Sequence, residues 1–319
     1  MRNRTAACIA VDPLKKKSFG SRLLASVYQY PLLYLMAIPI FAYYIIFCYW
    51  PMYGALIAFK DYKIVKGVWG SPWVGFKHFE AFFNSPNFFR LVRNSLSINL
   101  RELIFLFPVP IIFALLLNEV RSVHFRRITQ TITYMPHFVS SIVICGLLKS
   151  FTSTNGIITT FFVSMGMERV NMLTKAEYFQ PLLIGMYIWS SFGWSSIIYF
   201  AALSGLDQEL YDAAWVDGAG RFRRIWHVTL PGIMPTVVIM LVLRIGSMMS
   251  VGFGDIINLY NPLTYETADV ISTYVYRMGI TKFQFSSSTA IDLFNSVINI
   301  ILLVGANTLS RHFSETSLW

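Results

Sequence analysis

Polar and aromatic side chains recur at helical spacing inside two long apolar segments, around residues 181–203 and 290–309. Hydroxyl and amide groups can bind the hydroxyls of a sugar, and flat aromatic rings can cover its apolar face. The two stripes are therefore a candidate pathway for a hydroxyl-bearing substrate such as a sugar, formed by Tyr187, Ser191, Trp194, Asp292, Asn295 and Asn299. The alternative is that these side chains only hydrogen-bond neighbouring helices, as such residues often do in membranes.

Two other polar residues of the apolar segments have more ordinary expectations. Arg244 should form a structural ion pair, with Asp255 or with a carboxylate of a partner chain, because a lone charge at membrane depth is costly. His137 directly follows Pro136 near a helix start, where a capping role is expected.

The segment from Ser204 to Pro235 is too long for a passive connection and has helical periodicity of its own. Asp207 is a candidate N-cap, and Gly218 and Gly220 end the first helix. A basic stretch, residues 221–228, follows. The pattern predicts two short helices that meet at a glycine corner, with small and large side chains suited to a groove on a partner protein. The alternative is an interfacial helix that rests on lipid headgroups.

Sequence patterns of catalysis and metal binding are missing. No G-x-S-x-G, H-E-x-x-H or paired-carboxylate arrangement occurs. The three cysteines, Cys8, Cys48 and Cys145, do not form a C-x-x-C motif. No G-x-x-x-x-G-K-[ST] loop is present, so any ATP and Mg²⁺ must be bound by another chain. We therefore expect no catalytic residue, metal or cofactor in this chain.

The composition is that of a polytopic membrane protein. Of 319 residues, 55% are hydrophobic and 13% are charged, against roughly 25% charged in soluble domains. The net charge of +10 is typical of topology signals and contact with lipid rather than of nucleic-acid binding. These figures exclude disordered, collagen-like and disulfide-rich classes and most soluble enzymes.

Six segments are long and apolar enough to cross a bilayer, which predicts an all-α fold with six transmembrane helices. They are residues 30–59, 96–117, 132–151, 181–203, 231–257 and 290–309, and Pro108 and Pro110 interrupt the second. The segment before the first span is polar and basic, so that span is expected to be uncleaved.

Basic residues give the expected orientation. Thirteen Lys and Arg fall on the side of the two termini and ten on the other, which places both termini in the cytoplasm. The predicted organisation is a cytoplasmic basic segment at residues 1–29, a transmembrane domain at 30–310 with a long cytoplasmic loop at 205–230, and a cytoplasmic tail at 311–319.

The loop at residues 205–230 resembles a known motif, and the resemblance implies that it is the coupling loop of a permease domain. Asp212-Ala-Ala-x-x-Asp217-Gly-Ala, followed by Leu230-Pro231-x-x-x-Pro235, resembles the EAA loop of bacterial ABC-importer permeases, with Asp212 in place of the usual Glu. The resemblance implies helices that dock into a cleft of a cytoplasmic ATPase. The expected coupling residues are Tyr211, Asp212, Ala213, Ala214, Trp215, Asp217, Gly218, Ala219, Gly220, Arg221, Pro231 and Pro235.

Further stretches resemble LplB-type, MalF-like carbohydrate permeases over residues 23–319. They are Asn94-Ser-Leu, the segments 108–119 and 134–140, and the ending Ser314–Trp319. The resemblance implies a type I importer half in a bacterial plasma membrane. Its partners would be a second homologous permease, two ATPase subunits and an extracytoplasmic sugar-binding lipoprotein, and its substrates oligosaccharides or polysaccharide fragments.

Two other classes compete with this interpretation. A membrane-embedded enzyme acting on lipid-linked substrates would use Asp255, Glu266, Asp269 and Asp292 as acid and base. A secondary transporter would show internal repeats, and none is evident.

Overall fold

The computed structural model describes residues 28–249 and 252–313, so the predicted terminal segments 1–29 and 311–319 lie almost wholly outside the described residues. The chain forms two compact units, which divide after Ala55. The described part is helical, and its β-structure is limited to one antiparallel bridge between Lys60 and Trp73.

The described residues of the first unit, from Tyr28 on, form one apolar helical segment. It is built from α2 (Pro31–Tyr43), the π-helix η1 (Tyr44–Tyr49) and the start of the 3₁₀-helix η2 (Trp50–Phe59). The whole segment from Pro31 to Phe59 carries no charged side chain. It agrees with the first predicted span.

The second unit contains four more helices with the length and composition of membrane spans. Phe88–Asn118 joins α5 (Phe88–Arg101), η4 (Glu102–Leu106) and α6 (Pro108–Asn118), and Ala176–Ser204 joins α10 (Ala176–Ser195) and α11 (Ile197–Ser204). Arg221–Gly246 joins α13 (Arg221–Arg224), η7 (Ile225–Thr229) and α14 (Leu230–Gly246), and α18 runs from Phe285 to Phe313.

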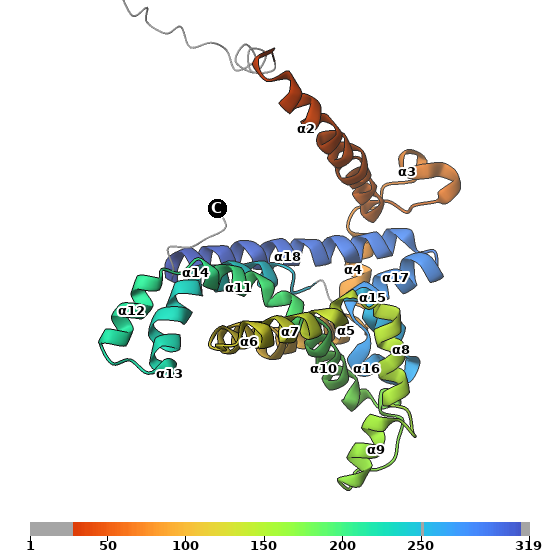
Figure 1. The fold of residues 1–319 in the computed structure, drawn as a ribbon. Coiled ribbons are helices and arrows are strands. Elements are labelled where there is room, and N and C mark those ends of the chain that lie inside the picture. The colour runs from red at the N-terminus through yellow and green to blue at the C-terminus, as the bar shows by residue number, and fades with distance from the viewer. Residues whose placement is uncertain (1–27, 250–251, 314–319) are drawn as a thin grey trace, which may run out of the picture. The chain divides into compact units, whose positions relative to one another are not determined.

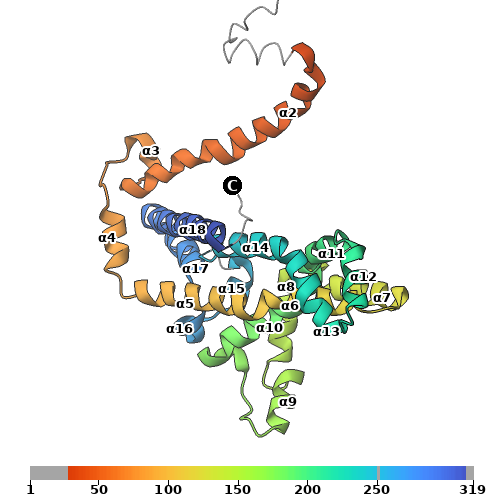
Figure 2. The same cartoon turned by 90° about the vertical axis from the view of Figure 1, so that its left-hand side faces the viewer.

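Shorter elements connect these spans. They are η3 (Ile64–Lys66), α3 (Gly67–Gly70), α4 (Lys77–Phe83), α9 (Ile157–Ser164), η6 (Met172–Thr174), α12 (Gln208–Val216), η8 (Pro262–Thr264), α16 (Tyr265–Ala268), α17 (Ile271–Tyr276) and η9 (Arg277–Thr281). Both views place the connection between α6 and α7 (Val123–Tyr134) at the same end of this unit as α12 and α13, and away from α9 and α16 (Figures 1 and 2).

The third predicted span, residues 132–151, is not one straight helix. It comprises α7 (Val123–Tyr134) with η5 (Met135–Phe138), and then α8 (Ser141–Phe151), and the two arms are bent by 95°. Pro136 removes a backbone donor, and Val139 and Ser140 are extended, so the hydrogen-bond ladder stops between the arms. If the arms count as one span, the described residues contain six.

The fifth span also differs from the predicted range 231–257. It begins ten residues earlier and ends at Gly246, and α15 (Phe253–Leu259) is a separate helix. The non-helical backbone after Gly246 finds a hydrogen-bond partner in a neighbouring helix. Oδ1 of Asn299 in α18 accepts a hydrogen bond of 2.9 Å from the Met249 N–H. Non-helical backbone at membrane depth requires such partners.

Prolines inside three spans do not break them. Pro51, Pro108 and Pro231 each follow a π-helical segment, η1, η4 or η7, that ends two residues earlier. A proline ring clashes with the carbonyl four residues before it, and in all three cases that carbonyl belongs to the widened π turn. The predicted interruption at Pro108 and Pro110 is therefore a change of helical register.

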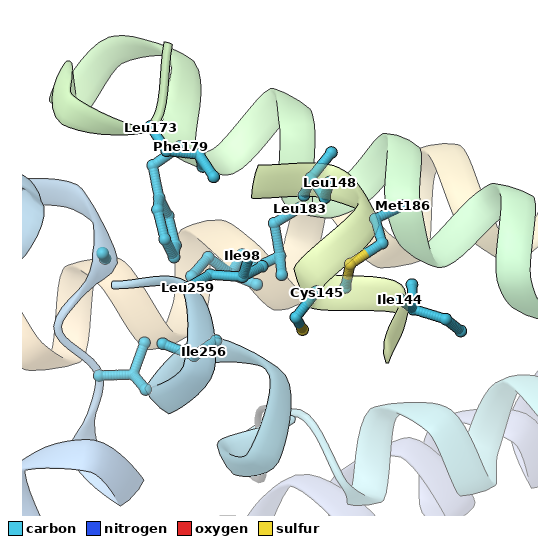
Figure 3. Packing of buried hydrophobic residues seen from close by; sticks show 12 residues of the cluster. Ile98, Ile144, Cys145, Leu148, Leu173, Phe179, Leu183, Met186, Ile256 and Leu259 are labelled. Carbon is cyan, nitrogen blue, oxygen red and sulfur yellow. The ribbon is translucent and has the colours of Figure 1, made fainter. Parts of the chain in front are cut away.

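Three apolar clusters hold the second unit together. The largest joins α5, α8, α10 and α15, and Figure 3 shows Cys145, Leu183, Ile256 and Leu259 meeting in it. A second lies where Phe82 of α4 and Leu91 of α5 meet the start of α18. The third packs α6 and α11 against α14 beside the α12 connection.

Candidate functional site

The predicted coupling loop folds into a corner of two helical arms, which we call the elbow (residues 207–229). Oδ1 of Asp207 accepts a hydrogen bond of 3.0 Å from the Glu209 N–H, as expected of an N-cap. Gly218 ends α12 with a φ of +74°, a conformation that glycine adopts without steric cost. Gly220 begins the second arm as the N-cap of α13.

The second arm is not a separate short helix. From Arg221 the chain continues through η7 into α14 without a break, so the arm is the first part of the fifth span. The two arms are tied together by the Tyr211 hydroxyl, which donates a hydrogen bond of 3.1 Å to Oγ1 of the buried Thr229. Thr229 was missed in the sequence because nothing in the motif marks it.

The elbow presents large apolar side chains and separated charges. Trp215 is 71% exposed and Phe222 is 87% exposed. The first arm carries acidic side chains and the second basic ones; they are Asp207, Glu209, Asp212 and Asp217, and Arg221, Arg223 and Arg224. Of the other predicted coupling residues, Ala213, Pro231 and Pro235 are exposed, and Ala214 and Ala219 are half-buried beside a notch of about 230 Å³.

The predicted pathway residues lie in different surroundings. Tyr187 of α10 lies near Asp255 of α15, because both side chains approach the same glycine, Gly252. A Cβ atom added to Gly252 would be 2.5 Å from the Tyr187 hydroxyl oxygen and 3.4 Å from Asp255 Oδ2. Ser191 bonds the Tyr187 carbonyl of its own helix at 2.6 Å. Trp194 stacks on His137, with ring centroids 4.6 Å apart.

The stripe on α18 does not join the one on α10. Asp292 is exposed, Asn295 is buried, and Asn299 holds the break after α14. α18 packs mainly on α14 and α17, whereas α10 packs on α16, α7 and α6. The pathway therefore stays a prediction, and within this chain its two stripes are not brought together.

Arg244 pairs with Glu102, not with the expected Asp255. Asp255 instead lies against Cys145, whose Sγ is 3.8 Å from its carboxylate. His137 packs against Trp194 from the last turn of η5 and does not begin a helix.

The carboxylates of the enzyme alternative do not converge. Asp269 is fully buried and bound to the guanidinium groups of Arg277, at 2.6 Å, and Arg90, at 3.4 Å. Burial lowers the pKa of Arg277, but the hydrogen bond and the charge of Asp269 outweigh it and raise that pKa above its ordinary value. Within residues 28–249 and 252–313, no three His, Cys, Asp or Glu side chains are placed to hold one metal ion.

Residues 107–315 match the family described as "Binding-protein-dependent transport system inner membrane component". This range contains the elbow and Arg244. The chain belongs to this family. It is thus a multi-pass membrane component of an ABC transport system, and ATP hydrolysis belongs to a separate subunit. The enzyme alternative is thereby excluded.

Relatives within this transport family match over nearly their full length. Protein LplB of Bacillus subtilis (strain 168) is 46% identical over 308 residues, which cover 96% of this chain and 97% of that protein. The polygalacturonan/rhamnogalacturonan transport system permease protein YteP of the same organism is 42% identical over 321 residues and covers 100% of both chains. A solved bacterial alginate ABC transporter, in complex with an alginate pentasaccharide-bound periplasmic protein, contains a chain with a TM-score of 0.85 and 41% identity, covering 93% of this chain and 100% of that one.

Proposed function

We propose that this chain is the permease half of an ATP-driven importer of oligosaccharides, and that the elbow receives the movement of the ATPase. The observation that carries the proposal is the continuity of the second arm with the fifth span. Because Arg221 and Arg244 belong to one helical segment, a displacement at the elbow also displaces the membrane-embedded end of that segment. The exposed Trp215 and Val216 offer apolar surface to a docking partner.

The proposed assembly contains a second homologous permease, two ATPase subunits and an extracytoplasmic sugar-binding lipoprotein. The alginate transporter, which was solved with a periplasmic protein bound, supports the last of these. The missing nucleotide-binding loop supports the ATPase subunits, since this chain has no phosphate-binding motif of its own.

The proposed orientation puts the elbow and both termini in the cytoplasm. Its support is the distribution of basic residues, together with the position of the α6–α7 connection, which contains Arg121, at the elbow's end of the unit. On this orientation, the segments around α9 and α16 face the binding protein.

The proposed cargo is an acidic oligosaccharide built from uronate sugars. Support comes from two relatives: YteP is named for polygalacturonan and rhamnogalacturonan, and the transporter of similar fold imports alginate, an acidic polysaccharide.

The test is reconstitution of this chain, with the permease, ATPase and binding protein that co-purify with it, into liposomes. We expect trigalacturonate to accumulate only when ATP is supplied on the elbow's side of the bilayer, and the neutral maltotriose to be excluded. Uptake of maltotriose at the same rate would overturn the acidic cargo. Failure of any ATPase to co-purify would overturn the importer itself.

A further inference from the structure

The ion pair between Glu102 and Arg244 lies inside two membrane-spanning helices. Glu102 is the first residue of the π-helical segment η4, and Arg244 lies in the last turn of α14, just before the break that Asn299 holds. Charged groups at membrane depth are expensive, so they are expected to pair or to face a cavity. Arg244 does both.

The two partners are exposed to very different degrees. The Glu102 side chain is 6% exposed and that of Arg244 is 35% exposed. Arg244 lines a cavity of about 650 Å³ between α6, α10, α11 and α14, together with Phe107, Trp194, Ser195, Tyr199 and Met240, and Glu102 is not among the lining residues. The volume is within the roughly 300–1,000 Å³ of typical ligand sites.

The chemistry of the guanidinium leaves it able to bind a second anion. Arginine has five N–H donors in a planar fork, and one carboxylate engages at most two of them in a bidentate pair. Arg244 lines a cavity whose other walls are mostly apolar, and a charge-assisted hydrogen bond made there by a donor that Glu102 does not engage is strong. Trp194 adds an aromatic surface at the same cavity.

We propose that Arg244 binds a carboxylate of the transported oligosaccharide in this cavity, and that Glu102 positions and neutralises the guanidinium when no cargo is present. This inference rests on the proposed acidic cargo. On this proposal, Arg244 of the permease distinguishes acidic from neutral oligosaccharides during translocation, in addition to any selection by the binding protein.

The experiment compares Arg244→Gln, Arg244→Lys and the double variant Glu102→Gln/Arg244→Gln in the reconstituted complex. The substrates are trigalacturonate and its fully methyl-esterified, neutral counterpart. The double variant leaves no unpaired charge, so its complex should elute and melt like the wild type, whereas Arg244→Gln alone leaves a buried carboxylate unpaired. Arg244→Lys keeps the charge but loses the fork, so an intermediate rate is expected.

We expect the double variant to take up trigalacturonate at least about tenfold more slowly than the wild type, the factor that corresponds to losing one charge-assisted hydrogen bond. Uptake of the ester, relative to the wild type, should fall less than twofold. Recovery of trigalacturonate uptake to the wild-type rate in the double variant would show a purely structural pair and overturn the inference. Equal loss of both substrates would do the same, and would be expected if a lipid chain filled the cavity. If the wild type transports neither substrate, the proposed function itself fails.

Discussion

The Tyr211 hydroxyl and Thr229 Oγ1 are 3.1 Å apart and join the two arms of the elbow with a single side-chain hydrogen bond. The bond fixes the angle between α12 and the fifth span, because Tyr211 lies in the middle of one arm and Thr229 at the buried end of the other. Tyr211→Phe removes this bond and should cost about 0.5–1.5 kcal/mol.

The expected result of Tyr211→Phe is hydrogen exchange about fivefold faster at the amides of α12, since about 1 kcal/mol changes an opening equilibrium by that factor. ATP-driven uptake should fall along with it. Thr229→Ser keeps the hydroxyl and is the matched control. Unchanged exchange in Tyr211→Phe would mean that apolar contacts alone set the angle of the elbow.

Gly218 is the position where the elbow depends on backbone freedom. Its φ is +74°, and a Cβ there would meet nothing within 4 Å, so a substitution is penalised only by the backbone. Gly218→Val should destabilise the corner by roughly 1–2 kcal/mol, and Gly218→Asn by less, because asparagine tolerates this region. Gly220 has equal space and a φ of −67°, and it is the N-cap of α13, so Gly220→Ser, which keeps a favoured N-cap residue, should leave the melting temperature nearly unchanged. Equal destabilisation by the Val and Asn variants would contradict the argument.

Asp269 is the buried anchor between α5 and α17. Asp269→Asn leaves two guanidinium groups without their anion and should cost about 3–5 kcal/mol, measured as a lower melting temperature of the purified chain. Arg277→Gln should cost more than Arg90→Gln, because Arg277 is the less exposed partner and is closer to the carboxylate. A larger destabilisation by Arg90→Gln than by Arg277→Gln would indicate that the ion pair with Arg90 is the more stabilising one.

Two glycines of α10 provide a matched pair for helix packing. A Cβ on Gly193 would collide with the Thr133 carbonyl of α7, whereas one on Gly185 would meet nothing within 4 Å. Gly193→Ala should therefore cost about 1–3 kcal/mol through overpacking. Gly185→Ala should be neutral, or stabilising by up to about 1 kcal/mol, through helix propensity. Thermal unfolding of both variants in the same detergent tests the contrast, and similar melting temperatures would contradict the close approach of α7 and α10.

Hydropathy was sufficient to predict the spans that are continuous, and local capping rules were sufficient for Asp207 and Gly218, because those signals act within a few residues. The bend at Val139 and the break after Gly246 were not predicted. An apolar window cannot register a change of direction, although Pro136 and the glycines around the break were visible signals. The π turns before three prolines were also missed, since propensities describe helix content and not register.

The candidate sites could be predicted where their residues are close together in the sequence. The elbow depends on one contiguous segment, and its motif was visible. The Glu102–Arg244 pair joins helices far apart in the sequence, and a single sequence does not state which acidic residue meets which arginine. For the same reason Asn299 could be placed on a polar stripe, but its bond to the backbone of Met249 could not be anticipated.

The extended residues Val139 and Ser140 separate two helical arms that pack on partly different neighbours. The arm before them, α7, packs on α10, and the arm after them, α8, packs on α15 and the first half of α10. If α15 moves relative to α10, α8 can follow α15, on which it packs more extensively, while α7 stays on α10, and the two backbone residues between the arms absorb the change in angle. Bilayer-embedded helices can then change their relative tilt without any of them having to bend.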